Sequence, residues 1–275
     1  MNWQTSRFTI DLSRPQVMGI VNVTPDSFSD GGRHDTTAAA LAHCEQLLQD
    51  GAHILDIGGE STRPGAPPVG LEDELARVLP VVKGAVKLGV PVSVDTYKPE
   101  VMRAVLDAGA DIINDVWALR RGDGLSAVAA HPNCGVCLMH MHLEPQTMQI
   151  APMSGDVVAQ VRHFLRERVQ TLQAAGVARE RIALDVGIGF GKTVEQNFAL
   201  LAAQAELLDE AMPWLVGWSR KSSLGAVTGR SVPAERVAAS VAAALLAVDR
   251  GAHIVRVHDV RETVDALKVW AAMRG

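Results

Sequence analysis

The stretch DGAHILDI, residues 50–57, contains the unit whose repetition decides the fold. Gly51 follows a helix-like segment, and the apolar run Ile54–Ile57 comes after it, with Asp56 as its polar residue. A glycine just past a helix supplies the left-handed C-cap that turns the chain into the next strand. The same unit recurs as Ala108-Gly109-Ala110, Ala175-Gly176-Val177 and Arg250-Gly251-Ala252. It predicts a chain in which helices and short buried strands alternate.

Eight strand candidates extend this alternation over the whole chain: Val17–Val21, Ile54–Ile57, Pro91–Val94, Asp111–Ile113, Val136–Met139, Ile182–Leu184, Leu215–Gly217 and Ile254–Val257. They are apolar without polar alternation, as parallel strands covered by helices are. Helical patterns lie between them, at Thr37–Gln49, Glu72–Lys87, Glu100–Ala108, Asp156–Ala175, Ala234–Asp249 and Arg261–Met273. The sequence therefore predicts an α/β protein with one (β/α)₈ TIM-barrel domain over residues 1–275. A doubly wound open sheet is the alternative, and it would normally place a glycine-rich loop at the first βα turn.

A polar residue stands at or near the end of each predicted strand: Asn22, Asp56, Asp95, Asn114, His140, Asp185, Ser219 and His258. In (β/α)₈ barrels the catalytic and binding groups come from the carboxyl ends of the strands. Capping of the following helices explains some of these residues, but it explains His140 and His258 poorly. The pattern predicts an enzyme with one central site.

The composition fits a compact soluble enzyme. Of 275 residues, 48% are hydrophobic and 21% charged, and the net charge of −5 gives no indication of a nucleic-acid-binding face. No run approaches the ~18 apolar residues of a membrane span. The N-terminus shows no charged-then-apolar signal sequence, so we expect a cytoplasmic protein.

The three cysteines are Cys44, Cys134 and Cys137. The C-x-x-C spacing of the last two is found in redox pairs and in half-sites for zinc. Here the pair leads into an apolar run instead of opening a helix, and no second C-x-x-C exists in the sequence. We expect buried or edge thiols.

Two junctions, residues 22–35 and 58–70, are too long for simple βα connections, which usually run 2–6 residues. They are rich in Gly, Pro, Ser and Thr, and they hold Asn22, Asp26, Asp30, Thr62 and Arg63 close together. Long loops on the catalytic face are commonly lids or substrate clamps. We favour such a role over a disordered insertion.

The polar residues divide into two chemical groups. Arg63, Arg256 and His258 suit a phosphate-like anion, and Asn22 and Thr62 suit contacts to the anion or its metal. Mg²⁺ prefers hard oxygen ligands and is often held by one or two protein groups together with substrate phosphates. If Arg256 and His258 face the barrel mouth, Val255 and Val257 should face the helices.

The second group offers donors, acceptors and both charges, at Asp95, Asn114, Asp185 and Lys221. A buried carboxylate can accept hydrogen bonds from an amidine-like edge, so this set suits a flat heterocycle with amino and oxo groups. The alternatives are that Asp95 satisfies loop backbone and that Asn114 with Asp115 caps a helix.

The pair His140-x-His142 raises a metal hypothesis, because alternate strand residues share a face. In metal-dependent barrel hydrolases, however, the paired histidines close the first strand and an Asp closes the eighth. Here the pair closes the fifth strand. We therefore expect a structural or supporting role for His140 and a loop position for His142.

Long motifs in this chain resemble the bacterial dihydropteroate synthases. They are MGIVNVTPDSFSDGG (18–32), DIGGESTRPGA (56–66), SVDTYKPEV (93–101), INDV (113–116), LMHM (138–141), DVGIGFGK (185–192), WSRKSSLG (218–225) and VRVHDV (255–260). The resemblance covers nearly the whole chain. It implies a barrel transferase of folate biosynthesis that joins (7,8-dihydropterin-6-yl)methyl diphosphate to 4-aminobenzoate and releases pyrophosphate with Mg²⁺.

The resemblance also implies a role for each matching residue. Asn22 matches the ligand of Mg²⁺ and pyrophosphate, and the other pyrophosphate contacts are Thr62, Arg63, Arg256 and His258. The pterin contacts are Asp95, Asn114, Asp185, Lys221 and Arg256. The 4-aminobenzoate pocket is formed by Phe28, Pro64, Phe190 and Ser222. Asp30 matches a residue that assists a cationic intermediate, and the residues implied in catalysis are Asp30, Arg63, Asp95 and Lys221.

Two departures from the family pattern concern loops. Val186 stands where Pro is usual after Asp185, which we expect to loosen the backbone beside a pterin contact. His142-Leu143 replaces the usual Gln-Gly of the fifth loop, which bears on that loop's conformation. The helical stretch Ala234–Asp249 is rich in small apolar residues that permit close helix approach, so we expect a homodimer formed on the helical side; the alternative is that this helix packs only on its own barrel. The resemblance supports the dimer and further implies sulfonamides as competitive inhibitors. The alternatives are a pterin-binding methyltransferase domain and a catalytically silent paralogue, both separable by a pyrophosphate-release assay.

Overall fold

The computed structural model describes residues 1–24, 33–61, 65–144, 148, 150–207 and 212–275. Eight parallel strands close into a barrel in the order β10-β3-β4-β5-β6-β7-β8-β9. Their bounds are β3 (Gln16–Asn22), β4 (Ile54–Gly58), β5 (Val92–Asp95), β6 (Ile112–Asp115), β7 (Gly135–Met139), β8 (Ile182–Asp185), β9 (Trp214–Val216) and β10 (Ile254–Val257). The predicted barrel is confirmed, and the doubly wound alternative is wrong because the sheet closes on itself.

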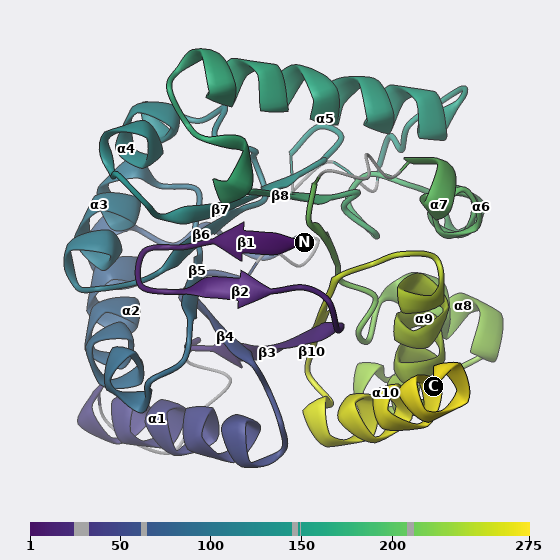
Figure 1. The fold of residues 1–275 in the computed structure, drawn as a ribbon, viewed down its shortest axis with the longest axis horizontal. Coiled ribbons are helices and arrows are strands. Elements are labelled where there is room, and N and C mark those ends of the chain that lie inside the picture. Colours follow the sequence, from purple (N-terminus) through teal and green to yellow (C-terminus); the bar gives the residue numbers. More distant parts are fainter. Residues whose placement is uncertain (25–32, 62–64, 145–147, 149, 208–211) are drawn as a thin grey trace.

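Helices surround the barrel (Figure 1). They are α1 (Arg33–Gln49), α2 (Leu71–Ala85) with η2 (Val86–Leu88), α3 (Pro99–Asp107), α4 (Gly124–Ala130), α5 (Val157–Ala174), η3 (Arg179–Arg181), α6 (Val194–Ala202), α7 (Gln204–Leu207), α8 (Ser222–Thr228), η4 (Pro233–Arg236), α9 (Val237–Asp249) and α10 (Val260–Arg274). All six predicted helices are present. The sequence analysis missed α4, α7 and α8, which have seven, four and seven residues and are too short to develop a helical period. It also missed α6, although this helix is as long as α3, with nine residues. A capping box, in which Thr193 and Gln196 bond each other's backbone, marks the start of α6 and was a readable signal.

The glycine turns behave as the opening stretch predicts. Gly51 follows α1 with φ of 100°, a left-handed conformation that favours glycine. Equivalent turns occur at Gly109, Gly176 and Gly251, with φ of 99°, 88° and 90°. Each ends a helix and feeds the next strand.

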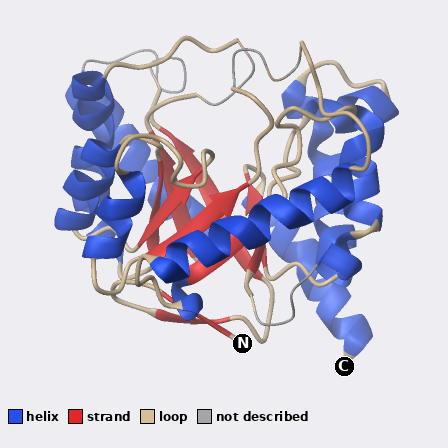
Figure 2. Cartoon of the chain, turned by 90° about the horizontal axis from the view of Figure 1, so that it is seen from above, coloured by secondary structure: helices blue, strands red, loops and turns tan. Residues whose placement is uncertain are grey.

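An N-terminal hairpin that the sequence analysis did not predict closes one end of the barrel. It consists of β1 (Asn2–Gln4) and β2 (Thr9–Asp11), paired antiparallel. Trp3 and Ile10 are buried in it, and they pack with the barrel-interior residues of the cluster that includes Met18 and Ile54. The described parts of the βα loops lie at the opposite end (Figure 2). The hairpin therefore leaves only that opposite mouth for a site.

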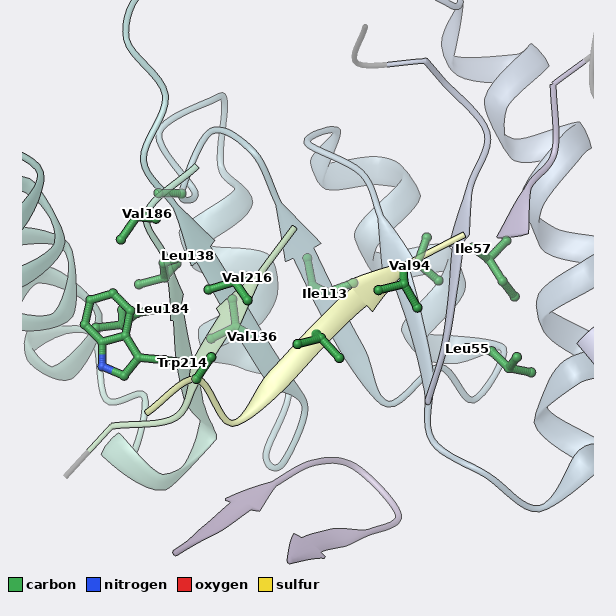
Figure 3. Packing of buried hydrophobic residues seen from close by; sticks show 14 of the residues in the cluster. Leu55, Ile57, Val94, Ile113, Val136, Leu138, Leu184, Val186, Trp214 and Val216 are labelled. Carbon is green, nitrogen blue, oxygen red and sulfur yellow. The ribbon is translucent and has the colours of Figure 1, made fainter. Parts of the chain in front are cut away.

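The alternation of side chains along the strands separates an outer core from the barrel interior. Leu55, Ile57, Val94, Ile113, Val136, Leu138, Leu184, Trp214 and Val216 point toward the helices (Figure 3). Val255 and Val257 belong to the same outer core, as predicted. Residues of opposite parity, among them Asp56 and Arg256, face inward.

No single described helix is long and apolar enough to cross a membrane. One bent pair, Ser222–Thr228 with Pro233–Asp249, meets the criteria of length and composition, with an angle of 76° between its two parts.

Candidate active site

The predicted site residues that the structure describes lie at the loop end of the barrel: Asn22, Asp95, Asn114, Asp185, Phe190, Lys221, Ser222, Arg256 and His258. Adjacent strands place several of them as neighbours, because Asn22 pairs with Gly58, Gly58 with Asp95, and Asp95 with Asn114. The remaining predicted residues, Asp26, Phe28, Asp30, Thr62, Arg63 and Pro64, lie outside the described residues.

Arg256 links two carboxylates across the barrel mouth. Its Nε donates to Asp56 Oδ2 at 2.6 Å, and its Nη2 donates to Asp95 Oδ2 at 2.9 Å. Desolvation opposes the charged guanidinium, but attraction by Asp56 and Asp95 outweighs it and raises the pKa of Arg256. The arginine is therefore a fixed cation whose orientation two strands control.

Asp56 lies at the mouth, and the sequence analysis assigned no role to it. Its side chain is fully buried, and its Oδ2 also accepts from Asn114 Nδ2 at 3.3 Å. Asp56 therefore connects Asn114 with Arg256. The signal was available, since Asp56 is one of the polar residues near strand ends and shares its inward parity with its neighbours on adjacent strands.

Asp95 and Asn114 face the site instead of capping local backbone. The backbone caps come from Asp115, whose carboxylate accepts from Trp117 N at 2.8 Å and Leu119 N at 2.7 Å. Burial raises the pKa of Asp95 to about 7, with Arg256 opposing the rise and Asp56 adding to it. A carboxyl group that titrates near neutrality at a barrel mouth is typical of an active site.

The opposite wall of the site is formed by Asp185, Phe190 and Lys221. Lys221 Nζ lies 4.3 Å from the centre of the Phe190 ring. Burial lowers the pKa of Lys221 to about 8, and Asp185 opposes that change. Burial also raises the pKa of Asp185, whose Oδ1 accepts from Gly187 N at 2.7 Å. One face of the site thus offers a cation, a carboxylate and an aromatic ring.

The sixth loop is pinned despite the departure at Val186. Val186 is buried in the outer core, and Gly187 is held by Asp185 on one side and by Lys192 on the other. Gly187 has φ of 69°, and a Cβ there would stand 1.9 Å from His140 O. Two hydrogen bonds thus hold the backbone that follows Val186, and the effect of the missing proline on its stiffness stays a prediction.

Leu143, the second departure, adopts a left-handed conformation. Its φ is 61° and its side chain is exposed. A non-glycine residue in this region carries backbone strain, which glycine would avoid. The fifth loop therefore keeps a glycine-like turn without a glycine.

His140 is buried and its Nδ1 lies 2.9 Å from Lys192 Nζ. Burial, followed by the charge of Lys192, lowers the pKa of His140 to about 2, so the ring is neutral. His142 lies in the loop, as expected. Within the described part of the chain no group of three His, Cys, Asp or Glu residues could hold a metal ion. The described residues give no support to a hydrolase-type metal centre at this pair.

Residues after β9 and β10 complete the mouth. Ser219 Oγ lies 2.9 Å from His258 Nδ1 and accepts from His258 N at 3.1 Å, which fixes the imidazole. Ser222 begins α8 with an exposed side chain, and Asn22 ends β3 half-buried.

A buried ion network anchors the start of the second long loop. Lys98 Nζ contacts both Glu60, in the loop, and Glu74, in α2. Tyr97 Oη donates to Glu60 at 3.0 Å, and Thr96 Oγ1 donates to Glu74 at 2.6 Å. The sequence analysis missed this network, although four of its residues lie inside the quoted motifs.

The cysteine prediction is confirmed. Cys44, Cys134 and Cys137 are free and buried. Cys134 belongs to the outer core and Cys137 to the barrel interior.

Comparison with known proteins identifies the family. A family model described as "Pterin binding enzyme" matches residues 18–258. The dihydropteroate synthase of Neisseria meningitidis serogroup B is 53% identical over 98% of this chain and 97% of its own length. The chain belongs to the dihydropteroate synthase family. The resemblance seen in the motifs is thereby confirmed, and the family consists of transferases of folate biosynthesis.

A further relative and two solved structures support the same family. The dihydropteroate synthase of Escherichia coli K12 is 50% identical over 96% of this chain and 93% of its own length. The Burkholderia cenocepacia dihydropteroate synthase complexed with 7,8-dihydropteroate is 56% identical, covers 99% of this chain and 96% of its own, and superposes with a TM-score of 0.91. A Yersinia pestis dihydropteroate synthase with a sulfonamide drug complex is 46% identical over 100% of this chain and 99% of its own, with a TM-score of 0.94.

Proposed function

We propose that the barrel mouth joins (7,8-dihydropterin-6-yl)methyl diphosphate to 4-aminobenzoate, giving 7,8-dihydropteroate and pyrophosphate. The observation that carries the proposal is the Asp56–Arg256–Asp95 linkage at the mouth, which faces a second wall of Asp185 and Lys221. Relatives crystallised with 7,8-dihydropteroate or 4-aminobenzoic acid support the choice of substrates.

The pterin binds between the two walls. Asp95 and Asp185 accept from its amino and ring N–H groups, and Lys221 donates to its ring acceptors. Asn114 adds an amide that Asp56 orients, and the Arg256 guanidinium lies over one face of the pterin. These contacts hold the reactive methylene carbon toward the loops.

The diphosphate lies beside Asn22, Arg256 and His258, with Thr62 and Arg63 contributing from the second loop. The donor set suits a Mg²⁺ ion that arrives with the diphosphate, because Asn22 offers one neutral oxygen and Mg²⁺ often takes few protein ligands besides substrate phosphates. When bound, Mg²⁺ would neutralise charge on the pyrophosphate leaving group.

In the reaction the bond between the methylene carbon and the diphosphate oxygen breaks, and pyrophosphate leaves with the electron pair. Arg63, Arg256 and His258 stabilise its growing negative charge. The methylene carbon becomes cationic, and Asp95, together with Asp30, stabilises it electrostatically. The amine of 4-aminobenzoate then forms the new C–N bond and releases a proton, so no covalent enzyme intermediate is needed.

The 4-aminobenzoate pocket consists of Phe28, Pro64, Phe190 and Ser222, with Ser222 near the carboxylate. The two long loops exclude water that would otherwise capture the cation. Sulfonamides would compete for this pocket. The Yersinia pestis relative solved with a sulfonamide drug complex supports that part of the proposal.

Separate measurement of binding and turnover tests this division of the site. Lys221→Ala and Asp185→Asn should weaken pterin binding roughly tenfold to a hundredfold, the worth of a hydrogen bond to a charged group. Arg63→Ala should instead lower kcat, because its contacts strengthen as pyrophosphate charge develops. The binding measurement uses a pterin without diphosphate. If Arg63→Ala weakens that pterin as much as Lys221→Ala does, the assignment is wrong.

We also propose a homodimer formed on the helical side of the barrel. In α9 the residues Ala243, Ala244 and Ala247 pack on the chain's own core, whereas Leu246 is exposed. Further exposed apolar side chains lie in α8, just before η4 and in α10: Val227, Val232, Val269 and Met273. Burial of such side chains against a second copy would stabilise a dimer. Light scattering at micromolar concentration that detects only monomer would rule it out.

We further propose a cytoplasmic location. The three unpaired, buried thiols are typical of proteins from a reducing compartment. Cell fractionation with an antibody to the chain tests this.

A further inference from the structure

Lys192 is a buried lysine for which the reaction has no direct use. It ends the motif DVGIGFGK, directly before α6, and is 3% exposed. No described carboxylate forms an ion pair with it, and its main electrostatic attraction comes from Asp185. Burying an unpaired ammonium is costly unless hydrogen bonds satisfy its protons. Its surroundings must therefore supply acceptors.

Four acceptor atoms surround Lys192 Nζ. They are His140 Nδ1 at 2.9 Å, Gly187 O at 2.9 Å, Phe190 O at 3.1 Å and His140 O at 3.3 Å. An ammonium group donates three hydrogen bonds and accepts none, so it satisfies the three acceptors within 3.1 Å and shares a proton with His140 O, the most distant of the four. A neutral methylene or thioether side chain would take this donor away from all four acceptors. Gly187 O and Phe190 O would keep backbone donors, Phe190 N at 3.1 Å and His142 N at 3.5 Å, whereas His140 Nδ1 and His140 O have no other donor among the described residues.

The acceptors belong to two different segments. His140 is fixed at the end of β7, where its N donates to Asp185 O at 3.0 Å and its ring packs edge-on against Phe164 at 4.9 Å. Gly187 and Phe190 lie in the sixth loop. Lys192 therefore ties the loop to a rigid strand end.

This tie includes the backbone of Phe190. The Phe190 carbonyl accepts from Lys192, and its ring lies in a cluster with Met139, Met141 and Met148. The Phe190 ring also contacts Lys221, whose Nζ lies 4.3 Å from the ring centre. Lys192 thus lies behind the aromatic wall without reaching the mouth itself.

We propose that Lys192 is a positioning residue that sets the shape of the 4-aminobenzoate subsite by holding the Phe190 backbone against the end of β7. The inference rests on the proposed function, which places Phe190 in that subsite. Lys192 acts through Phe190 and His140 and does not contact the substrates. Its loss should therefore affect one substrate more than the other.

Lys192→Met keeps the length of the side chain and removes the donors. We expect the KM for 4-aminobenzoate and the inhibition constant of a sulfonamide to rise roughly tenfold, the effect of one hydrogen bond to a charged group. The KM for the pterin substrate should change less than about threefold. Lys87→Met, at an exposed lysine in η2, is the matched control and should alter neither constant.

His140 gives a second test that leaves Lys192 in place, which matters if Lys192→Met does not fold. His140→Asn retains an acceptor near the Nδ1 position, and His140→Leu removes it. We expect His140→Leu to raise the 4-aminobenzoate KM severalfold and His140→Asn to restore most of the difference. Equal effects of the two substitutions would overturn the proposal.

The remaining outcomes separate the positioning role from a structural one and from failure of the proposed function. An unchanged 4-aminobenzoate KM in folded Lys192→Met, or equal rises in both KM values, contradicts the positioning role. Phe190→Ala tests the underlying assignment independently. If it leaves the 4-aminobenzoate KM unchanged, the proposed subsite is wrong whatever Lys192 does.

Discussion

Removal of the Asp56 carboxylate should destabilise the barrel and disturb Arg256. Asp56 is fully buried and accepts from Arg256 Nε at 2.6 Å and from Asn114 Nδ2 at 3.3 Å. Removing one partner of a buried ion pair costs ~3–5 kcal/mol. After the substitution Arg256 would still pair with Asp95 at 2.9 Å, and its side chain is 22% exposed, so we expect a cost at the lower end of this range. We expect Asp56→Ala to lower the free energy of unfolding by about 3 kcal/mol.

Asp56→Asn separates charge from shape. It retains an acceptor oxygen, so a charge-assisted hydrogen bond is replaced by a neutral one, with a loss of about 1 kcal/mol. Asp265→Asn is the control, because Asp265 is 66% exposed and, among the residues that the structure describes, its ion pair is with exposed Lys268. Such a surface pair contributes little. Urea unfolding at unchanged m-value measures all three variants.

A second readout follows the site itself. The charge of Asp56 helps to raise the pKa of Asp95, after the larger effect of burial. Asp56→Asn should therefore move the acid limb of pterin binding to lower pH. The reasoning is refuted if Asp56→Ala unfolds like Asp265→Asn, or if the acid limb of Asp56→Asn stays in place.

Three further predictions concern the same mouth. Pterin affinity should be highest between about pH 7 and pH 8, because burial raises the pKa of Asp95 to about 7 and lowers that of Lys221 to about 8. At lower pH the affinity decreases because Asp95 gains a proton, and at higher pH it decreases because Lys221 loses one. Titration calorimetry should show that the pterin affinity of Lys221→Met no longer decreases on the alkaline side. Gly187→Ala should abolish activity, because its Cβ would stand 1.9 Å from the backbone oxygen of His140. Gly176→Ala is the control: Gly176 has φ of 88° but open space around it, so the substitution should lower the free energy of unfolding by only about 1 kcal/mol. Binding should be ordered, with the pterin substrate and Mg²⁺ first, because two residues of the 4-aminobenzoate pocket come from loops that pyrophosphate contacts. Tight calorimetric binding of 4-aminobenzoate to enzyme alone contradicts that order.

Much of the architecture could be predicted because its signals are local. The glycine turn at Gly51 and the apolar run after it depend only on neighbouring residues, and their repetition predicts the alternating strands and helices. The two-residue period of a strand correctly predicted that Val255 and Val257 face the helices and that Arg256, between them, faces the barrel interior. The sequence analysis did not predict the N-terminal hairpin and α8, because three-residue strands and a seven-residue helix are too short to show a period.

The sequence by itself determined which residues stand at the strand ends and, through the motifs, the chemistry of the family. Only the tertiary structure decided their partners. Asp56 and Arg256 are 200 residues apart in sequence, and they meet because barrel closure brings β10 beside β3 and β3 beside β4. Lys192 and His140 meet across 52 residues for the same kind of reason. Local preferences fix each strand separately, whereas register and closure fix which buried charges must compensate one another.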